Sequence, residues 1–129
     1  MPNKTKALRV LIVDDDELIR VLLKSLLNLL GEEVAGEAAD GEEAVSRYPT
    51  LKPDVTLLDV EMPVKNGFDT LKDIKRLDAD AEIIMLTAND NTAVAESCIH
   101  AGARSYIKKG LTAEMLKSTL QTHLDALKV

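Results

Sequence analysis

Cysteine is nearly absent from the sequence: Cys98 is the only one in 129 residues, so the chain cannot form an internal disulfide. This composition is compatible with a reducing cytoplasm. Cys98 lies within a helical pattern, and we expect it to be a small buried side chain and not a reactive thiol. Tryptophan is missing and aromatic residues make up only 2% of the chain, so the large side chains that often anchor protein interfaces are few.

Long apolar runs are absent as well. No segment approaches the ~20 consecutive apolar residues that a membrane-spanning helix needs. Residues 1–6 are polar and lack the apolar core of a signal peptide. We therefore expect a cytoplasmic protein without membrane insertion.

The chain also lacks an excess of positive charge. It carries 22 acidic against 16 basic residues, which gives a formal net charge of −6. A protein that binds DNA or RNA needs a basic face to neutralise the phosphates. No direct nucleic-acid partner is therefore expected.

What remains is an ordinary globular composition, with 46% apolar and 29% charged residues and no internal repeat or evident linker. The length fits one domain built around one core. We expect a single domain over residues 1–129, with its core between about residues 8 and 127.

Short apolar runs alternate with helical patterns five times along the chain. The apolar runs, which we expect to be strands, cover residues 8–13, 34–38, 54–58, 81–86 and 104–108. The helical patterns cover residues 17–30, 41–48, 68–77, 92–101 and 112–127. We expect the second helix to end before Pro49 and Thr112 to cap the last one.

This alternation predicts an α/β fold with a five-stranded parallel sheet and helices on both faces, because parallel strands need helical crossovers. In such sheets the ligand site lies beyond the carboxyl ends of the strands. The polar residues at those ends are Asp14, Asp15, Asp16, Asp59, Thr87 and Lys109.

Carboxylates from two neighbouring strands that meet at one edge repel each other unless a cation joins them. Oxygen ligands without a Cys or His cluster favour Mg²⁺, with Mn²⁺ as a substitute. Beside such an ion, a carboxylate can attack a phosphoryl donor and form an aspartyl phosphate. A lysine and a hydroxyl at the same edge would stabilise charge on the transferring oxygens.

Five motifs occur in order at these strand ends. They are Val-Asp-Asp (13–15), Leu-Asp-Val-Glu-Met-Pro (58–63), Gly67, Leu-Thr-Ala (86–88) and Gly-Ala-Arg-Ser-Tyr-Ile-Lys-Lys (102–109). Through them the chain resembles the receiver domains of response regulators, the chemotaxis-type family of two-component signalling, over residues 9–127. The resemblance implies a flavodoxin-like fold of five strand–helix units.

The resemblance also implies a role for each matching residue. Asp59 would accept the phosphoryl group, with Thr87 and Lys109 assisting the transfer. Tyr106 would act as an aromatic switch. The Mg²⁺ ligands would be Asp14, Asp15, Asp59 and the backbone carbonyl of Glu61.

Two further positions match sites that tune phosphoryl lifetime in this family. Glu61 lies two residues past the acceptor, and Asn89 lies two residues past the switch hydroxyl. We expect their side chains to influence how long the phosphoryl group survives, in a direction that the sequence leaves open.

The chain departs from the family pattern after the active-site lysine, where Gly110 replaces the usual proline. A cis bond to a non-proline residue costs roughly 2.5–4 kcal/mol, so we expect a trans bond there. The neighbouring Lys108 is a rival for the lysine role, but the family spacing from the aromatic residue favours Lys109. His100 and His123 are expected to be ordinary helix residues.

The resemblance implies that the phosphoryl group comes from the phosphohistidine of a sensor histidine kinase or a phosphotransfer protein. The chain would not be an enzyme, beyond assisting its own phosphorylation and dephosphorylation. The signal would leave through the face made by residues 92–101, 104–108 and 112–127, toward an output protein or a second copy of the chain.

Three alternatives remain open at this point. A Mg²⁺-dependent phosphohydrolase of the haloacid-dehalogenase type also uses an aspartyl phosphate, but its motif Asp-x-Asp-x-Thr/Val ends where this chain has Leu18. A flavodoxin-like electron carrier needs a Ser/Thr-rich phosphate loop where this chain has three aspartates. A receiver that serves only as a docking module would need no phosphorylation.

Overall fold

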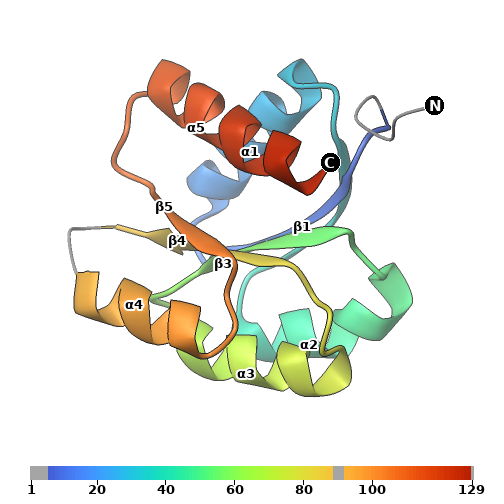
Figure 1. Ribbon diagram of the computed structural model, residues 1–129, viewed down its shortest axis with the longest axis vertical. Coiled ribbons are helices and arrows are strands. Elements are labelled where there is room, and N and C mark those ends of the chain that lie inside the picture. The colour runs from blue at the N-terminus through green and yellow to red at the C-terminus, as the bar shows by residue number, and fades with distance from the viewer. Residues whose placement is uncertain (1–5, 89–91, 129) are drawn as a thin grey trace.

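The computed structural model describes residues 6–88 and 92–128 as a five-stranded parallel sheet covered by helices on both faces (Figure 1). The strands are β1 (Arg9–Val13), β2 (Glu33–Ala38), β3 (Val55–Asp59), β4 (Ile83–Thr87) and β5 (Ser105–Lys108). The helices are α1 (Glu17–Leu29), α2 (Gly41–Leu51), α3 (Gly67–Leu77), α4 (Thr92–His100) and α5 (Ala113–Leu127). The strand order is β2-β1-β3-β4-β5. The predicted α/β fold is confirmed.

Two apolar clusters fill the spaces between the sheet and its helical layers. Val10 and Ile12 of β1 pack with α1 and α5 on one face. Leu11 and Val13 pack with α2, α3 and α4 on the other. Because successive strand residues point to opposite faces, a strand covered on both sides must be apolar along its length. This requirement leaves the ends of the strands as the places for charged side chains.

Polar side chains cap α1, α2, α3 and α5 at their N-termini. Each accepts a hydrogen bond from a backbone N–H of the first turn and so fixes where its helix begins. The pairs are Asp16 with Leu18, Asp40 with Glu43, Asn66 with Asp69, and Thr112 with Met115. The predicted cap at Thr112 is confirmed.

Helix α2 continues past Pro49 to Leu51, so the prediction that it ends before Pro49 is wrong. Proline inside a helix removes one backbone hydrogen bond and crowds the carbonyl four residues earlier, a cost that tertiary contacts must offset here. The turn is held by buried Tyr48, whose hydroxyl donates to Asp78 Oδ2 at 3.0 Å. The chain leaves the helix only at Lys52, where φ is 44°. The other predicted bounds agree with the observed ones to within two residues.

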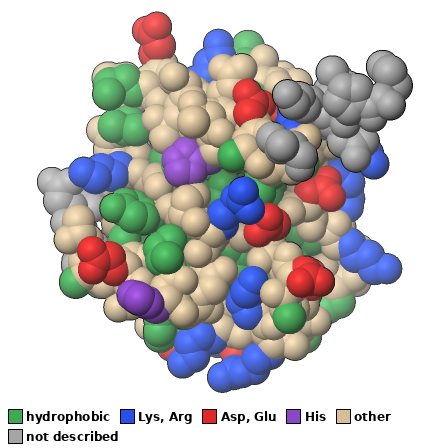
Figure 2. Space-filling view, in the orientation of Figure 1, with side chains coloured by type: hydrophobic (Ala, Val, Ile, Leu, Met, Phe, Trp, Pro, Cys, Tyr) green, Lys and Arg blue, Asp and Glu red, His purple; other side chains and the backbone are tan. Residues whose placement is uncertain are grey.

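Two smaller expectations, one about Cys98 and one about the bond after Lys109, are also met. Cys98 is fully buried in α4. The described residues contain no cis peptide bond, so the bond between Lys109 and Gly110 is trans. No helix in the described part of the chain is long and apolar enough to cross a bilayer. Acidic and basic side chains are interspersed over the face shown in Figure 2, without a continuous basic patch.

Candidate functional site

The carboxyl ends of the strands bring the predicted site residues to one edge of the sheet. Strand β3 lies between β1 and β4, so Asp59 at its end lies between Asp14 and Thr87. Lys109 follows β5, and its backbone N–H donates to the carbonyl of Thr87 at 2.8 Å. Its ammonium Nζ lies 3.1 Å from Asp14 Oδ2 and 3.1 Å from Asp59 Oδ1. Residues that are distant in the sequence therefore form one polar cluster.

Asp14 is fully buried, and both oxygens of its carboxylate accept hydrogen bonds. The backbone N–H of Asp16 donates to Oδ1 at 2.9 Å, and Lys109 Nζ donates to Oδ2 at 3.1 Å. The next residue, Asp15, is exposed. Asp14 and Asp15 therefore combine one buried carboxylate, fixed by hydrogen bonds, with one that faces solvent.

Asp59 is 1% exposed, and its two oxygens have different surroundings. Oδ1 accepts a hydrogen bond from the backbone N–H of Glu61 at 3.1 Å and pairs with Lys109. Oδ2 has no hydrogen-bond partner among the described residues. A Cβ atom at Gly67 would lie 2.1 Å from the Asp59 carbonyl oxygen, so α3 can begin this close to the strand only because residue 67 is glycine.

Burial raises the pKa of Asp59 to about 7, and the neighbouring charge of Asp14 adds to the rise. The ammonium of Lys109 opposes both effects. Burial by itself would lower the pKa of Lys109, but the carboxylates of Asp59 and Asp14 outweigh it and raise that pKa. The lysine therefore stays charged, while the acidic cluster still carries more negative charge than one lysine balances.

The acidic cluster fits a divalent cation. One carboxylate oxygen from each of Asp14, Asp15 and Asp59 lies within 4.8 Å of the others. Hard oxygen ligands with one side open to water match the preference of Mg²⁺, which keeps part of its hydration shell. A cation here would also give the unpartnered Oδ2 of Asp59 a partner, and its charge would oppose the effects of burial and of Asp14 that raise the pKa of Asp59.

The remaining predicted residues differ in how deeply they are buried. Thr87 is buried at the end of β4. Tyr106, on β5, is partly buried and packs against the apolar cluster under α2, α3 and α4. Lys108 is exposed, whereas the side chain of Lys109 contacts both buried carboxylates.

Four other positions were singled out from the sequence, and their surroundings differ. The side chain of Glu61 is exposed beside Asp59. Asn89 lies outside the described residues. His100 is an exposed helix residue, as expected. His123 is also on a helix, but its Nδ1 is hydrogen-bonded to the Ser105 hydroxyl at 2.8 Å, a contact that the sequence did not predict.

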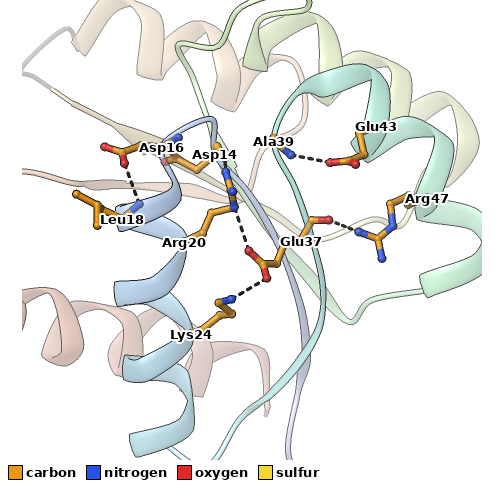
Figure 3. Close-up of polar contacts among 9 residues, drawn as sticks. All are labelled: Asp14, Asp16, Leu18, Arg20, Lys24, Glu37, Ala39, Glu43 and Arg47. Atoms are coloured by element: carbon orange, nitrogen blue, oxygen red, sulfur yellow. Dashed lines mark hydrogen bonds and ion pairs between the residues drawn. The ribbon is translucent and has the colours of Figure 1, made fainter.

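Sequence reasoning also missed a charged network behind the acidic pair (Figure 3). Arg20 of α1 donates through Nη1 to the backbone carbonyl of Asp14 at 2.6 Å and through Nε to Glu37 Oε1 at 3.0 Å. Lys24 donates to the other oxygen of Glu37 at 2.7 Å. The only signal in the sequence is the spacing of the two basic residues by four on one helix, which does not identify Glu37 as their partner.

The family model described as the response regulator receiver domain matches residues 10–121. The chain is 46% identical over 101 residues to the chemotaxis protein CheY of Thermotoga maritima, which covers 78% of this chain and 84% of that protein. It is 37% identical over 117 residues to CheY of Bacillus subtilis, with 91% and 98% covered.

Solved structures give the same result. The response regulator domain of Thermotoga maritima CheB has a TM-score of 0.84 at 32% identity, covering 96% of this chain and 98% of that one. A CheX–CheY–BeF3–Mg²⁺ complex from Borrelia burgdorferi has a TM-score of 0.83 at 30% identity, with 91% and 89% covered.

Proposed function

Because the chain belongs to the response-regulator receiver family of two-component signalling, we propose that Asp59 accepts a phosphoryl group from the phosphohistidine of a sensor histidine kinase or a phosphotransfer protein. The observation that carries this proposal is the carboxylate of Asp59, which is 1% exposed and has an oxygen without a partner among the described residues. A buried carboxylate oxygen without a hydrogen-bond partner lowers the free energy of unfolding. A ligand at the acidic cluster would account for it.

In the transfer step, a carboxylate oxygen of Asp59 attacks phosphorus and forms a P–O bond. The P–N bond to the donor imidazole breaks, and its electron pair returns to the nitrogen, which takes up a proton. When bound, Mg²⁺ would supply positive charge that screens the acidic cluster from the anionic phosphoryl group. Asp14, Asp15, Asp59 and the backbone carbonyl of Glu61 would hold it.

The protein's own groups assist at the oxygens of the phosphoryl group. Lys109, whose Nζ lies 3.1 Å from Asp59 Oδ1, is placed to pair with an oxygen on the phosphorylated side chain. Thr87, buried at the end of the adjacent strand, would donate its hydroxyl to another. The chain would assist its own phosphorylation and dephosphorylation and would not act as an enzyme on other molecules.

Phosphorylation adds about −1.5 to −2 charges at one point. Movement of Thr87 toward the new charge would make room for Tyr106 to change its rotamer. The affected surface would include Ala93, Val94, Ser97, Arg104, Tyr106, Thr112 and Lys117 on or beside α4, β5 and α5. We propose that this face binds an output protein or a second copy of the chain in the cytoplasm, and the CheY complex with CheX and Mg²⁺ supports a partner-binding role.

The lifetime of the phosphoryl group would depend on Glu61 and Asn89. The exposed carboxylate of Glu61 adds negative charge beside the position from which water attacks. Exchanging the two residues and timing the decay tests this role. A decay rate equal to that of the unaltered chain would exclude it.

Intact mass after incubation with acetyl phosphate, with and without Mg²⁺, tests the proposed function. We expect the chain to gain one phosphoryl group only with Mg²⁺, and Asp59→Asn to gain none. Asp80→Asn, a matched change at an exposed aspartate away from the site, should behave like the unaltered chain. A folded protein that binds Mg²⁺ but gains no mass from acetyl phosphate or from a phosphorylated kinase would identify a docking module instead.

A further inference from the structure

We propose that Arg20 is a positioning residue that fixes the Asp14–Asp15 peptide in the orientation needed to bind the cation, and that Glu37 holds Arg20 in place. This inference rests on the proposed function, because it concerns the same acidic pair. It adds residues of α1 and β2 that do not reach Asp59.

The guanidinium of Arg20 spans two elements of the structure (Figure 3). Its Nη1 donates to the carbonyl of Asp14 at 2.6 Å, while its Nε pairs with Glu37 Oε1 at 3.0 Å. The carbonyl of Asp14 and the amide of Asp15 belong to one planar peptide unit. A hydrogen bond that fixes the carbonyl therefore fixes the direction in which both acidic side chains leave the strand.

Arg20 provides a contact that a cation would not disturb. Besides the carbonyl, three groups of Asp14 are held: its N–H donates to the Ala38 carbonyl at 3.1 Å, and its two carboxylate oxygens accept from Asp16 and Lys109. A cation bound by the carboxylate would compete with the donors that these two oxygens already have. The bond from Arg20 is on the backbone, so it persists when the cation binds and keeps the pair in position.

Glu37 fixes the guanidinium of Arg20 and balances part of its charge. Its carboxylate also accepts a hydrogen bond from Lys24 at 2.7 Å, which is the main reason that the pKa of Glu37 is lowered, with a smaller contribution from Arg20 against the effect of burial. The guanidinium of Arg47 donates to the backbone carbonyl of Glu37. The side chain of Arg20 is only 16% exposed, so its two bonds compete little with water.

Positioning and simple electrostatics predict opposite results for Arg20→Met. If Arg20 acted only as a nearby positive charge, its removal would tighten Mg²⁺ binding, because like charges repel. If it positions the acidic pair, its removal should weaken Mg²⁺ binding by about tenfold or more, the usual effect of removing a group that orients a metal ligand. Arg20→Lys keeps the charge but cannot span both acceptors, so it should also weaken binding, by a smaller factor.

Isothermal titration with MgCl₂ alone, on the full chain without a phosphoryl donor, measures this effect. Arg9→Met is the matched control, because Arg9 also donates to backbone carbonyls and pairs with a glutamate, Glu33, but lies at the opposite end of β1 from Asp14. We expect less than a twofold change for that control. Circular dichroism checks that each variant is folded.

The result that overturns the inference is Mg²⁺ binding by folded Arg20→Met and Arg20→Lys within twofold of the unaltered chain, or tighter. If Arg20→Met does not fold, Arg20→Lys decides because it keeps the charge, with a loss of affinity of at least threefold expected and an unchanged affinity contradicting the inference. Failure of the proposed function has a different signature, since the unaltered chain would then gain no phosphoryl group, whereas the loss of Mg²⁺ affinity in the Arg20 variants would remain. An unaltered chain that binds no Mg²⁺ would overturn both.

Discussion

Two buried carboxylates share one ammonium at the edge of the sheet. Lys109 Nζ lies 3.1 Å from an oxygen of Asp14 and 3.1 Å from an oxygen of Asp59. At such distances and partial burial, each contact is electrostatically strong, but a single positive charge cannot neutralise two carboxylates and an incoming phosphoryl group. In the proposed transfer, the lysine would exchange its pairing with the two carboxylates for pairing with the phosphoryl group.

The substitution Lys109→Met should lower the initial rate of phosphorylation by acetyl phosphate by about 100-fold, the usual cost of losing a donor to a transferring oxygen. The side chain keeps its length and loses its charge. Mass spectrometry at short incubation times measures the rate. Lys108→Met, at an exposed neighbouring position, should stay within twofold of the unaltered chain. Equal rates for the two variants would contradict the role of Lys109.

The hydroxyl of Thr56 is a second residue-scale feature, because it is buried in β3 without a hydrogen-bond partner among the described residues. Thr56→Val replaces it with a methyl group of the same shape. The free energy of unfolding should rise by about 1 kcal/mol. Urea denaturation followed by circular dichroism gives this value.

Thr70→Val is the matched control for Thr56→Val. Thr70 is equally buried, but its hydroxyl donates to the Asn66 carbonyl at 2.8 Å. The same substitution there should lower the free energy of unfolding by about 1 kcal/mol. Changes of the same sign at the two positions would contradict this account.

The sequence makes some of these residues easy to find and hides others. Asp14, Asp59 and Lys109 each follow an apolar run, and the geometry of a parallel sheet brings such ends together whatever the details of packing. Arg20 and Glu37 meet because of the pairing of β1 with β2, whose register shifts between Val10 and Leu11. No local pattern encodes that shift, so their contact could not be predicted.

At the scale of elements, the spacing of apolar residues and the residues that end helices and strands explain most of the fold. The centre of each strand and helix could be predicted because burial on both faces demands continuous apolar runs and covering helices demand apolar stripes. The end of α2 could not, because the loss of one hydrogen bond at Pro49 is outweighed by the packing of Tyr48 against α3 and its bond to Asp78. A local rule fails there because a tertiary contact is stronger.

The contact between β5 and α5 predicts a pH dependence. Burial lowers the pKa of His123 from its ordinary value of 6.5, and its ring is hydrogen-bonded to Ser105 at 2.8 Å. Between the lowered pKa and 6.5, His123 binds more protons in the unfolded chain than in the folded one, so its contribution to stability should fall as the pH drops through this range. The raised pKa of Asp59 acts in the opposite direction, but equally in the unaltered chain and in a His123 variant. The pH-dependent contribution of this histidine to stability should be absent from His123→Gln.

Urea denaturation at a series of pH values from neutral to mildly acidic checks this expectation. As the pH falls, His123→Gln should become more stable relative to the unaltered chain. His100→Gln, at an exposed position of α4, should keep the full dependence. Parallel pH profiles for the unaltered chain and His123→Gln would show that burial of His123 has no such effect.

At the scale of the whole molecule, the two opposite edges of the sheet, where the strands begin and where they end, carry different polar contacts. The carboxyl edge carries the acidic cluster. Beyond the other edge, the chain after α5 is tied back to the turn between α1 and β2, because Lys128 Nζ pairs with Glu32 Oε2 at 2.6 Å. Glu32 also accepts the backbone N–H of Leu8 at 2.9 Å. This contact joins both ends of the described chain to one buried carboxylate.

Lys128→Met should lower the free energy of unfolding by roughly 3 kcal/mol, since it leaves the carboxylate of Glu32 buried without its cation. Urea denaturation measures the change. The double variant Lys128→Met/Glu32→Gln removes the uncompensated charge and should recover part of the loss. A double variant less stable than Lys128→Met would contradict this explanation.

The most direct test of the central claim is to locate the phosphoryl group on the chain. After phosphorylation with acetyl phosphate and Mg²⁺, borohydride reduces an aspartyl phosphate to homoserine, which tandem mass spectrometry places on a peptide. The account predicts homoserine at residue 59 and at no other position. Homoserine at residue 14 or 15, or a phosphoryl group that resists reduction on a hydroxyl side chain, would contradict it.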